Sequence, residues 1–271
     1  MHCFRSNLLF TSKLQDPTLA LVHISLLGGP LDELQLEGQL AGPKCRFSKT
    51  VEVPYALSRA PKSVGSWPAW RIFVPEPCLW EPSSPFLYQG RFVLRRQTEV
   101  LAEVQTRIGF KSIAMSGEGI RLNGEVLRLR AKRIECLTEK SAQNLRELGY
   151  NTVIASSGQD IARIYDTADE FGFLVLALVD ASNAEEMHQI KSHASCLGWI
   201  VKCEDFANLP AVVTNDREVL LGVQLSSEAD VAVPHSAQFV FRVGARPTFE
   251  RVVVAEGRKS REVVLLGEAD S

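Results

Sequence analysis

Residues 192–204 read Ser192-His-Ala-Ser-Cys-Leu-Gly-Trp-Ile-Val-Lys-Cys-Glu204, and this stretch decides how the second half of the chain folds. It contains the end of a helix, a tight turn at Gly198 and a buried apolar run from Leu197 to Val201. Glu204 follows at the C-terminal edge of that strand. In a β/α barrel the loops beyond this edge form the mouth of the site. The stretch therefore predicts a barrel strand with a carboxylate at its functional end.

The segments before this stretch alternate between strands and helices. An amphipathic helix is predicted over 161–171 and ends at Gly172, and a continuous apolar strand follows it. This alternation is typical of parallel βαβ units. Up to Glu204 the predicted elements are a strand at 127–133, helices at 141–148, 161–171 and 185–194, and strands at 152–155, 173–179 and 197–201. Further apolar runs follow at 211–213, 219–225, 239–243, 252–255 and 263–266. Asn123-Gly124, between two apolar runs, predicts a hairpin because both residues accept a positive φ.

The first 110 residues or so are predicted to be all-β. Short runs rich in β-formers are separated by Gly-Pro, Pro-rich or Asp/Ser segments, which is the pattern of an antiparallel sandwich. The predicted strands are 8–10, 19–27, 34–40, 46–53, 70–74, 86–94 and 100–108.

Composition narrows the classes of partner and compartment. The chain has 271 residues, of which 45% are apolar, and its 30 basic and 32 acidic side chains give a net charge of −2. Without a long basic run, neither nucleic acid nor an anionic membrane is expected as a partner. Six scattered cysteines without a CxxC pair indicate reduced thiols, and we expect a cytoplasmic protein. His188, His193 and Cys196 have no recognised ligand spacing, so neither a metal nor a cofactor is expected.

Several motifs resemble those of family 2 glycoside hydrolases, the β-galactosidases, β-mannosidases and β-glucuronidases. Their acid/base segment runs Asn-His-Pro-Ser-x-x-x-Trp-x-x-x-Asn-Glu, and His193, Ser195, Trp199 and Glu204 occupy matching positions. Cys203 stands where the family has the Asn before the Glu. Further resemblances lie in Pro75-Glu-Pro-Cys-Leu-Trp-Glu-Pro-Ser-Ser-Pro-Phe-Leu-Tyr88, Ile108-Gly-Phe-Lys111, 119–130, 148–153 and 165–172, so that the similarity covers about residues 75–204.

The resemblance implies a multi-domain β plus α/β protein. We expect an immunoglobulin-like β-sandwich over 1–112, followed by a shortened, degenerate TIM-type β/α barrel over 113–271. A complete barrel typically takes about 250 residues, and only residues 131–271 follow Arg130. The barrel is therefore expected to be truncated, to lack outer helices or to open into a sheet.

A retaining glycosidase needs two carboxyl groups about 5–5.5 Å apart. The resemblance implies Glu204 as acid/base, and His193, Trp199 and Cys203 as substrate-binding positions. Glu256, in Val252-Val-Val-Ala-Glu-Gly257, is the candidate nucleophile. Two alternatives stay open: Glu256 lies in a plain turn between two strands, and His193 holds a loop by hydrogen bonding.

Three departures from the family pattern argue against turnover. Cys203 is a weak donor in place of an Asn that bonds the sugar 2-hydroxyl. Ile154 stands where the family has an Arg, and Arg130-Ala-Lys-Arg-Ile-Glu135 lacks the family's Gly and His.

Three hypotheses follow. The first is a degenerate hydrolase homologue, a pseudoenzyme that binds carbohydrate or a protein partner and hydrolyses weakly or not at all. The second is a minimal retaining β-glycosidase that uses Glu204 and Glu256. The third is a non-catalytic scaffold that forms a homo-oligomer through uncovered barrel edges.

Overall fold

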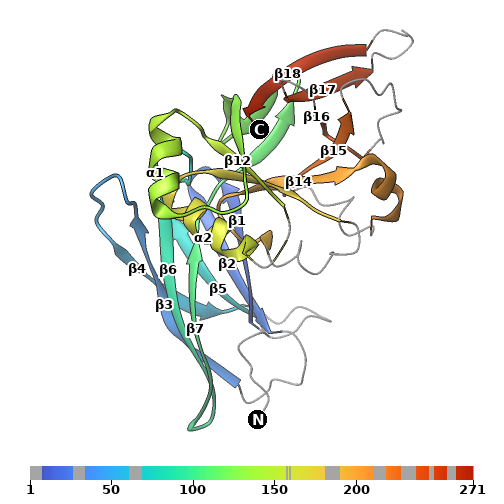
Figure 1. The fold of residues 1–271 in the computed structure, drawn as a ribbon. Coiled ribbons are helices and arrows are strands. Elements are labelled where there is room, and N and C mark those ends of the chain that lie inside the picture. Colours follow the sequence, from blue (N-terminus) through green and yellow to red (C-terminus); the bar gives the residue numbers. More distant parts are fainter. Residues whose placement is uncertain are drawn as a thin grey trace. The chain divides into compact units, whose positions relative to one another are not determined.

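The computed structural model describes residues 8–26, 34–60, 69–156, 158, 160–180, 190–209, 218–226, 236–243, 247–254 and 261–270. The chain forms two compact units, and Figure 1 shows the elements of each. The first unit is Met1–Trp80 with Ser84–Lys111, and the second is Glu81–Ser83 with Ser112–Ser271. In the described part of the chain, no helix has the length and apolar character needed to cross a membrane.

The first unit is a curled, sandwich-like sheet in the order β1-β2-β5-β4-β3-β6-β7. Every pair of neighbours is antiparallel, as the sequence predicted. Alternate side chains point inward and form one core that includes Trp70, Tyr88 and Phe92. The strands are β1 (Leu8–Asp16), β2 (Leu19–Leu26), β3 (Leu34–Lys44), β4 (Val53–Arg59), β5 (Ala69–Pro75), β6 (Leu87–Arg96) and β7 (Glu99–Ile108).

The strand predicted over residues 46–53 is wrong. The chain makes an isolated bridge between Cys45 and Ser48 there, and β4 begins only at Val53. The apolar side chains that suggested a strand have no core to enter, since Phe47 is 45% and Val51 83% exposed. Pairing with β3 and then with β5 places the strand later, at residues that reach a partner.

The second unit contains a small three-stranded sheet and a closed barrel. The small sheet contains the Asn123-Gly124 hairpin that the sequence predicted. Asn123 has φ 54° and Gly124 φ 89°, so the structure confirms the reason for that prediction. The sheet strands are β8 (Ile113–Ser116), β9 (Gly119–Leu122) and β10 (Glu125–Leu127).

Two helices lie beside the first barrel strands. Helix α1 (Glu139–Glu147) begins before the predicted start because Thr138 caps it, its Oγ1 accepting the Ser141 N–H at 3.2 Å. Helix α2 (Ile161–Phe171) has the predicted bounds and ends at Gly172 with φ 75°. The helix predicted at 185–194 falls mainly on residues outside the described part.

The barrel runs in the order β11 to β18 and closes on itself. Its strands are β11 (Leu129–Ile134), β12 (Thr152–Ser156), β13 (Leu174–Leu178), β14 (Cys196–Lys202), β15 (Leu220–Ser226), β16 (Phe239–Val243), β17 (Thr248–Val254) and β18 (Arg261–Asp270). Strands β11 to β16 are parallel, whereas β17 is antiparallel to both neighbours.

The closed barrel rules out the open sheet, and with only α1 and α2 as α-helices in its described part it fits the expected lack of outer helices. The antiparallel β17 departs from the expected parallel βαβ units. A parallel crossover needs a dozen or more residues, usually a helix. Only residues 244–247 and 255–260 separate the last three strands, so they must run antiparallel. The regular alternation of strand and helix is therefore not followed to the end of the chain.

The barrel wall has two buried faces. Val153, Val175 and Val201 point outward into a core shared with α2. Ile154, Leu176 and Ile200 alternate with them, face the interior and are at most 1% exposed. Further round the barrel, Phe241 stacks on Phe249 with ring centroids 5.0 Å apart. The described interior positions thus form a packed core, which leaves the strand ends as the place for a site.

Candidate functional site

Glu204 lies directly beyond the C-terminal end of β14. That strand pairs in parallel with β13 and with β15, and it is buried until Lys202, its last residue. The chain then enters the short 3₁₀ helix η2 (Cys203–Asn208), with Glu204 exposed in its first turn. The carboxylate is therefore at the end of the barrel where barrel enzymes have their sites.

Two local features hold this strand end in place. A Cβ at Gly198 would lie 2.0 Å from the carbonyl oxygen of Leu220, so only glycine permits the approach of β14 to β15. Phe206 of η2 is 5% exposed and packs into the helix-facing core. The apolar face of η2 is thereby anchored, and Glu204 stays on the exposed side.

Three barrel strands have a polar, exposed residue at their last inward position. They are Arg133 in β11, Ser156 in β12 and Lys202 in β14. Since the layer beneath them is apolar and buried, these side chains and Glu204 provide polar groups at this end of the barrel.

Trp199 lies on the other face of β14 from Ile200. It is 2% exposed and belongs to the core between the barrel wall and the helices, opposite Ala177 of β13. In this position the indole supports the strand that carries Glu204. Its predicted contact with a substrate would require that core to open.

His193 is held by Asp169 of α2. Its Nδ1 lies 2.8 Å from Asp169 Oδ2, and its ring centroid lies 5.1 Å from that of Tyr165. The contact is a hydrogen bond in the tautomer that carries its proton on Nδ1, with the carboxylate oxygen accepting. The other oxygen, Oδ1, accepts the backbone N–H of Ser195 at 2.7 Å. The structure thus places His193 in the loop-holding arrangement that the sequence left open.

Asp169 lies in the segment 165–172 that resembles the family, but sequence reasoning gave it no role. It is 2% exposed, in contrast to most carboxylates, and it links α2 to the segment entering β14. The sequence did contain a signal for the burial of Asp169. The residue comes four positions after Tyr165 and directly after Ala168, on the buried face of a helix whose bounds were predicted.

Two of the predicted site positions are not described structurally. The side chain of Cys203 and the whole of Glu256 lie outside the described part of the chain. The pairing of Glu204 with Glu256 therefore stays a prediction. Within the described ranges, no group of three or more His, Cys, Asp or Glu side chains has the geometry to hold a metal ion.

Sequence comparison identifies similar proteins. Residues 8–111 match the family described as "Glycosyl hydrolases family 2". A curated protein of Formosa agariphila named "Putative beta-glucuronidase" is 27% identical over 158 residues. The match covers 53% of this chain and 15% of that protein.

Solved structures of similar fold span both units. An FMN-binding beta-glucuronidase from Facaelibacterium prausnitzii L2-6 has a TM-score of 0.66 at 21% identity, over 87% of this chain and 42% of its own. A beta-glucuronidase from Ruminococcus gnavus has a TM-score of 0.63 at 17% identity, over 87% and 46%. A beta-glycosidase from Bacteroides vulgatus has 0.59 at 18% identity, over 80% and 33%.

The chain therefore spans less than half the length of each of these relatives. At these identities the structural likeness shows a shared fold alone. The chain is thus similar to family 2 glycosyl hydrolases over residues 8–111, and over most of its length it shares the fold of the beta-glucuronidases and the beta-glycosidase named above.

Proposed function

We propose that this chain binds carbohydrate at the C-terminal end of its barrel and hydrolyses it weakly or not at all. One observation carries the proposal: Glu204 is exposed directly beyond β14, at the end of the barrel where the resemblance to family 2 hydrolases puts the acid/base. A sugar at this end would meet Glu204 together with Lys202 and Arg133.

Weak or absent hydrolysis is supported by what surrounds Glu204. Ile154, at the position of the family's Arg, is fully buried in the apolar layer of the barrel. Cys203 replaces the Asn that strengthens its bond to the sugar 2-hydroxyl in the transition state, an interaction worth several kcal/mol. Since the Asn bond strengthens in the transition state, its loss removes catalysis before it removes binding.

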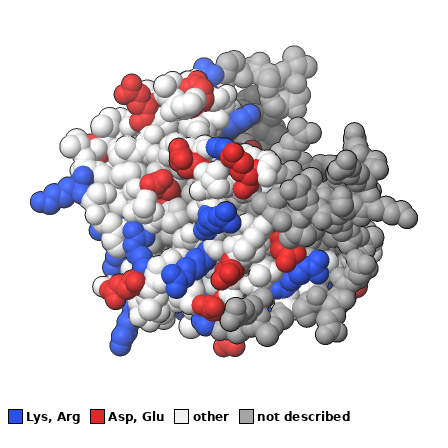
Figure 2. All heavy atoms as spheres, turned by 90° about the horizontal axis from the view of Figure 1, so that it is seen from above, with Lys and Arg blue, Asp and Glu red and all other residues white. Residues whose placement is uncertain are grey.

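The partner class follows from the same reasoning. Figure 2 shows acidic and basic side chains intermingled over the described part of one face, without a large field of one sign. With a net charge of −2, this supports a sugar over nucleic acid as the ligand. A cytoplasmic location stays a prediction from composition.

The test combines binding with turnover. Thermal unfolding is followed with methyl β-glucuronide, β-galactoside and β-mannoside, and each aryl β-glycoside is assayed for release of the aryl group. One sugar is expected to raise the melting temperature, because a ligand that binds only the folded state stabilises it. Glu204→Gln should weaken that effect, whereas Glu147→Gln, an exposed carboxylate on α1, should not. If none of the three sugars raised the melting temperature, the proposed carbohydrate binding would be refuted.

A retaining β-glycosidase remains the alternative that the resemblance supports. It requires that aryl glycosides be hydrolysed and that Glu204→Gln and Glu256→Gln each abolish turnover. Loss with Glu204→Gln alone would reject Glu256 as the nucleophile, and loss with Glu256→Gln alone would reject Glu204 as the acid/base.

The scaffold hypothesis loses its original argument. The described strands β11 to β18 close the barrel, so these strands offer no open barrel edge for self-association. It would need concentration-dependent association without any sugar effect.

A further inference from the structure

Strand β7 is the last strand at one edge of the sheet in the first unit. One of its sides pairs with β6, and no strand of the described part of the chain pairs with its other side. The backbone N–H and C=O groups along such an outer side can bond to the strand of another chain. An edge of this kind therefore has to be examined for what it could pair with.

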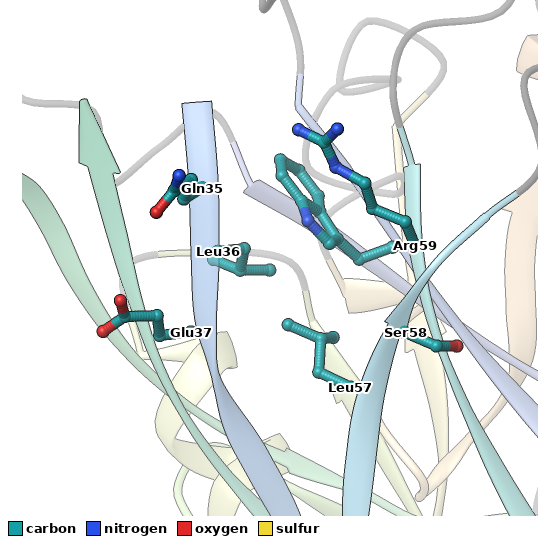
Figure 3. Close-up of a pocket in the computed structure, with 7 residues that line it drawn as sticks. Gln35, Leu36, Glu37, Leu57, Ser58 and Arg59 are labelled. Carbon is teal, nitrogen blue, oxygen red and sulfur yellow. The ribbon is translucent and has the colours of Figure 1, made fainter. Parts of the chain in front are cut away.

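Other places in the described chain offer less for strand pairing. Barrel strands β11 to β18 close on themselves, and the outer strands β8 and β10 of the small sheet have only four and three residues. Where β4 leaves β3, Arg59 Nη2 already donates to the carbonyl oxygen of Leu34 at 3.2 Å, and Trp70 beside it is buried. Figure 3 shows the Arg59 side chain at this gap, with Leu36 and Leu57 facing each other across it.

The part of β7 that can pair regularly is residues 102–108. A β-bulge at Leu101 interrupts the register with β6, which then runs without a shift from Ala102 to Ile108, the last residue of the strand. Gln105 is the middle of this segment. A second copy of the chain that pairs antiparallel over the whole segment therefore has the two-fold axis of the pair at Gln105.

In this register the charges of the two copies match. Glu103 lies two residues before the axis and Arg107 two residues after it, so Glu103 of each copy lies opposite Arg107 of the other. The three residues Glu103, Gln105 and Arg107 share one face of the strand, because side chains alternate between faces. Glu103 and Gln105 are exposed, and Arg107 is half-buried. Opposite charges directly across an antiparallel pair stabilise it, whereas like charges destabilise it.

Neighbouring registers lose this match. With the axis at Val104, Glu103 lies opposite Gln105, and Arg107 lies opposite the bulge at Leu101. With the axis at Glu103, the two Glu103 carboxylates face each other. The register that uses the whole regular segment is thus also the one in which each acidic side chain meets a basic one.

The outer strand at the other edge of the sheet, β1, has no such pattern. Its regular part, residues 8–14, contains Lys13 as its one charged residue, so a second copy would bring no acidic side chain to face it. A lysine on an outer strand is a common means of preventing pairing between edges. Self-complementarity therefore distinguishes β7 from β1.

We propose that two copies of this chain associate through β7, antiparallel over residues 102–108, with Glu103 of each copy opposite Arg107 of the other. The partner is a second copy, because the segment is complementary to itself about Gln105. Pairing would satisfy the outer main-chain groups of β7, join the two sheets into one and cover Val104, which is half-buried in the single chain. The interface uses no residue of the proposed carbohydrate site and does not rest on that function.

The test is self-association of the full chain. Sedimentation between about 5 and about 500 μM should show reversible dimers with a dissociation constant on the order of 100 μM, because one strand pair buries less than the roughly 1,200 Å² of a stable interface. Hydrogen exchange of the amides of residues 102–108 should become slower as the protein concentration rises, which locates the interface.

Charge reversal tests the register. Glu103→Arg and Arg107→Glu each place like charges opposite each other, and each should weaken association at least about tenfold. An equimolar mixture of the two variants should associate like the wild type, because every acidic side chain then faces a basic one again. Lys49→Glu, at an exposed position between β3 and β4, makes the same charge change as Arg107→Glu and should leave association unchanged.

A second pair of variants at the axis keeps the test decisive if Arg107→Glu does not fold. Gln105→Lys and Gln105→Glu, at an exposed position, should each weaken association alone and restore it when mixed. Dimers that persist in the single variants, mixtures that stay monomeric, slowed exchange only at other residues, or a wild-type chain that stays monomeric throughout would overturn the proposal.

Discussion

Arg146 of α1 donates a hydrogen bond from Nη1 to the carbonyl oxygen of Phe171, the last residue of α2, at 3.0 Å. The same guanidinium bonds to the carbonyl oxygens of Pro82 and Ser83, the latter at 2.9 Å. One cation thus ties residues from three parts of the sequence within the second unit. It also satisfies a carbonyl at the end of a helix, where the backbone has no partner of its own.

Replacement of Arg146 should therefore destabilise the second unit. Arg146→Ala removes donors from three carbonyl groups, and bonds from a charged donor contribute about 1.5–3 kcal/mol each at most. We expect a loss of about 2–4 kcal/mol in the free energy of unfolding, measured by urea denaturation. Arg163→Ala, at an exposed position on α2, is the matched control and should change stability by less than about 0.5 kcal/mol. Equal effects of the two variants would contradict the role of Arg146.

Gly172 should not tolerate a side chain. It has φ 75°, and a Cβ would lie 2.3 Å from the carbonyl oxygen of Pro82. Gly172→Ala combines left-handed strain of about 1–2 kcal/mol with that clash. Gly124→Ala is the control, because Gly124 has φ 89° but a Cβ there would meet nothing within 4 Å. Gly172→Ala should lower the melting temperature clearly more than Gly124→Ala, and a similar decrease in both would show that the clash is relieved.

Asp169 should matter for stability through His193 and Ser195. Asp169→Asn keeps an oxygen that can accept the Ser195 N–H, but it presents an amide in place of the charge beside His193 Nδ1. We expect a loss of about 1–3 kcal/mol in the free energy of unfolding. Asp160→Asn should be nearly neutral, since Asp160 makes no side-chain cap bond to α2. If Asp169→Asn left the free energy of unfolding unchanged, the hydrogen bonds of Asp169 would contribute nothing to stability.

Stability of the first unit should fall at alkaline pH. Burial raises the pKa of Tyr88, whose hydroxyl oxygen accepts the N–H of Cys78 at 2.9 Å, and burial also raises the pKa of Tyr55. A tyrosine has a pKa of about 10 in the unfolded chain. The stability that the protonated Tyr88 and Tyr55 hydroxyls contribute is therefore fully present below about pH 10. It is lost as pH rises toward the higher pKa of the folded state.

The measurement is the melting temperature as a function of pH, with tyrosinate absorbance recorded on the same sample. Tyr88→Phe should be less stable at neutral pH, because the Cys78 N–H loses its acceptor, and should show a smaller alkaline decrease. A wild-type curve that is flat above pH 10 would contradict the burial of this hydroxyl.

Several elements could be predicted because their signals are local. The bounds of α2 follow from apolar spacing and a terminal glycine, and the Asn123-Gly124 turn follows from two residues that accept positive φ. The position of Glu204 at a strand end could also be predicted, because a buried run followed by polar residues marks where a strand leaves the core.

The misplaced β4 and the roles of Trp199 and Asp169 were decided by contacts distant in sequence. An apolar residue becomes part of a strand only if a partner strand is there to pair with it, and residues 46–53 have none over most of their length. Trp199 could be recognised as a buried-strand residue, but which face of β14 it occupies depends on the register with β13 and on the packing of α2.

The sequence by itself determined the family resemblance, the all-β first half and the local helix and turn positions, since each depends on residues close together in the chain. Only the tertiary structure decided that the barrel closes through an antiparallel β17 and that His193 is held by a buried Asp169. It also decided that β4 separates from β3 around a hollow. Strand direction, register and burial are set by pairing and packing between distant segments, and their free energy is absent until those segments meet.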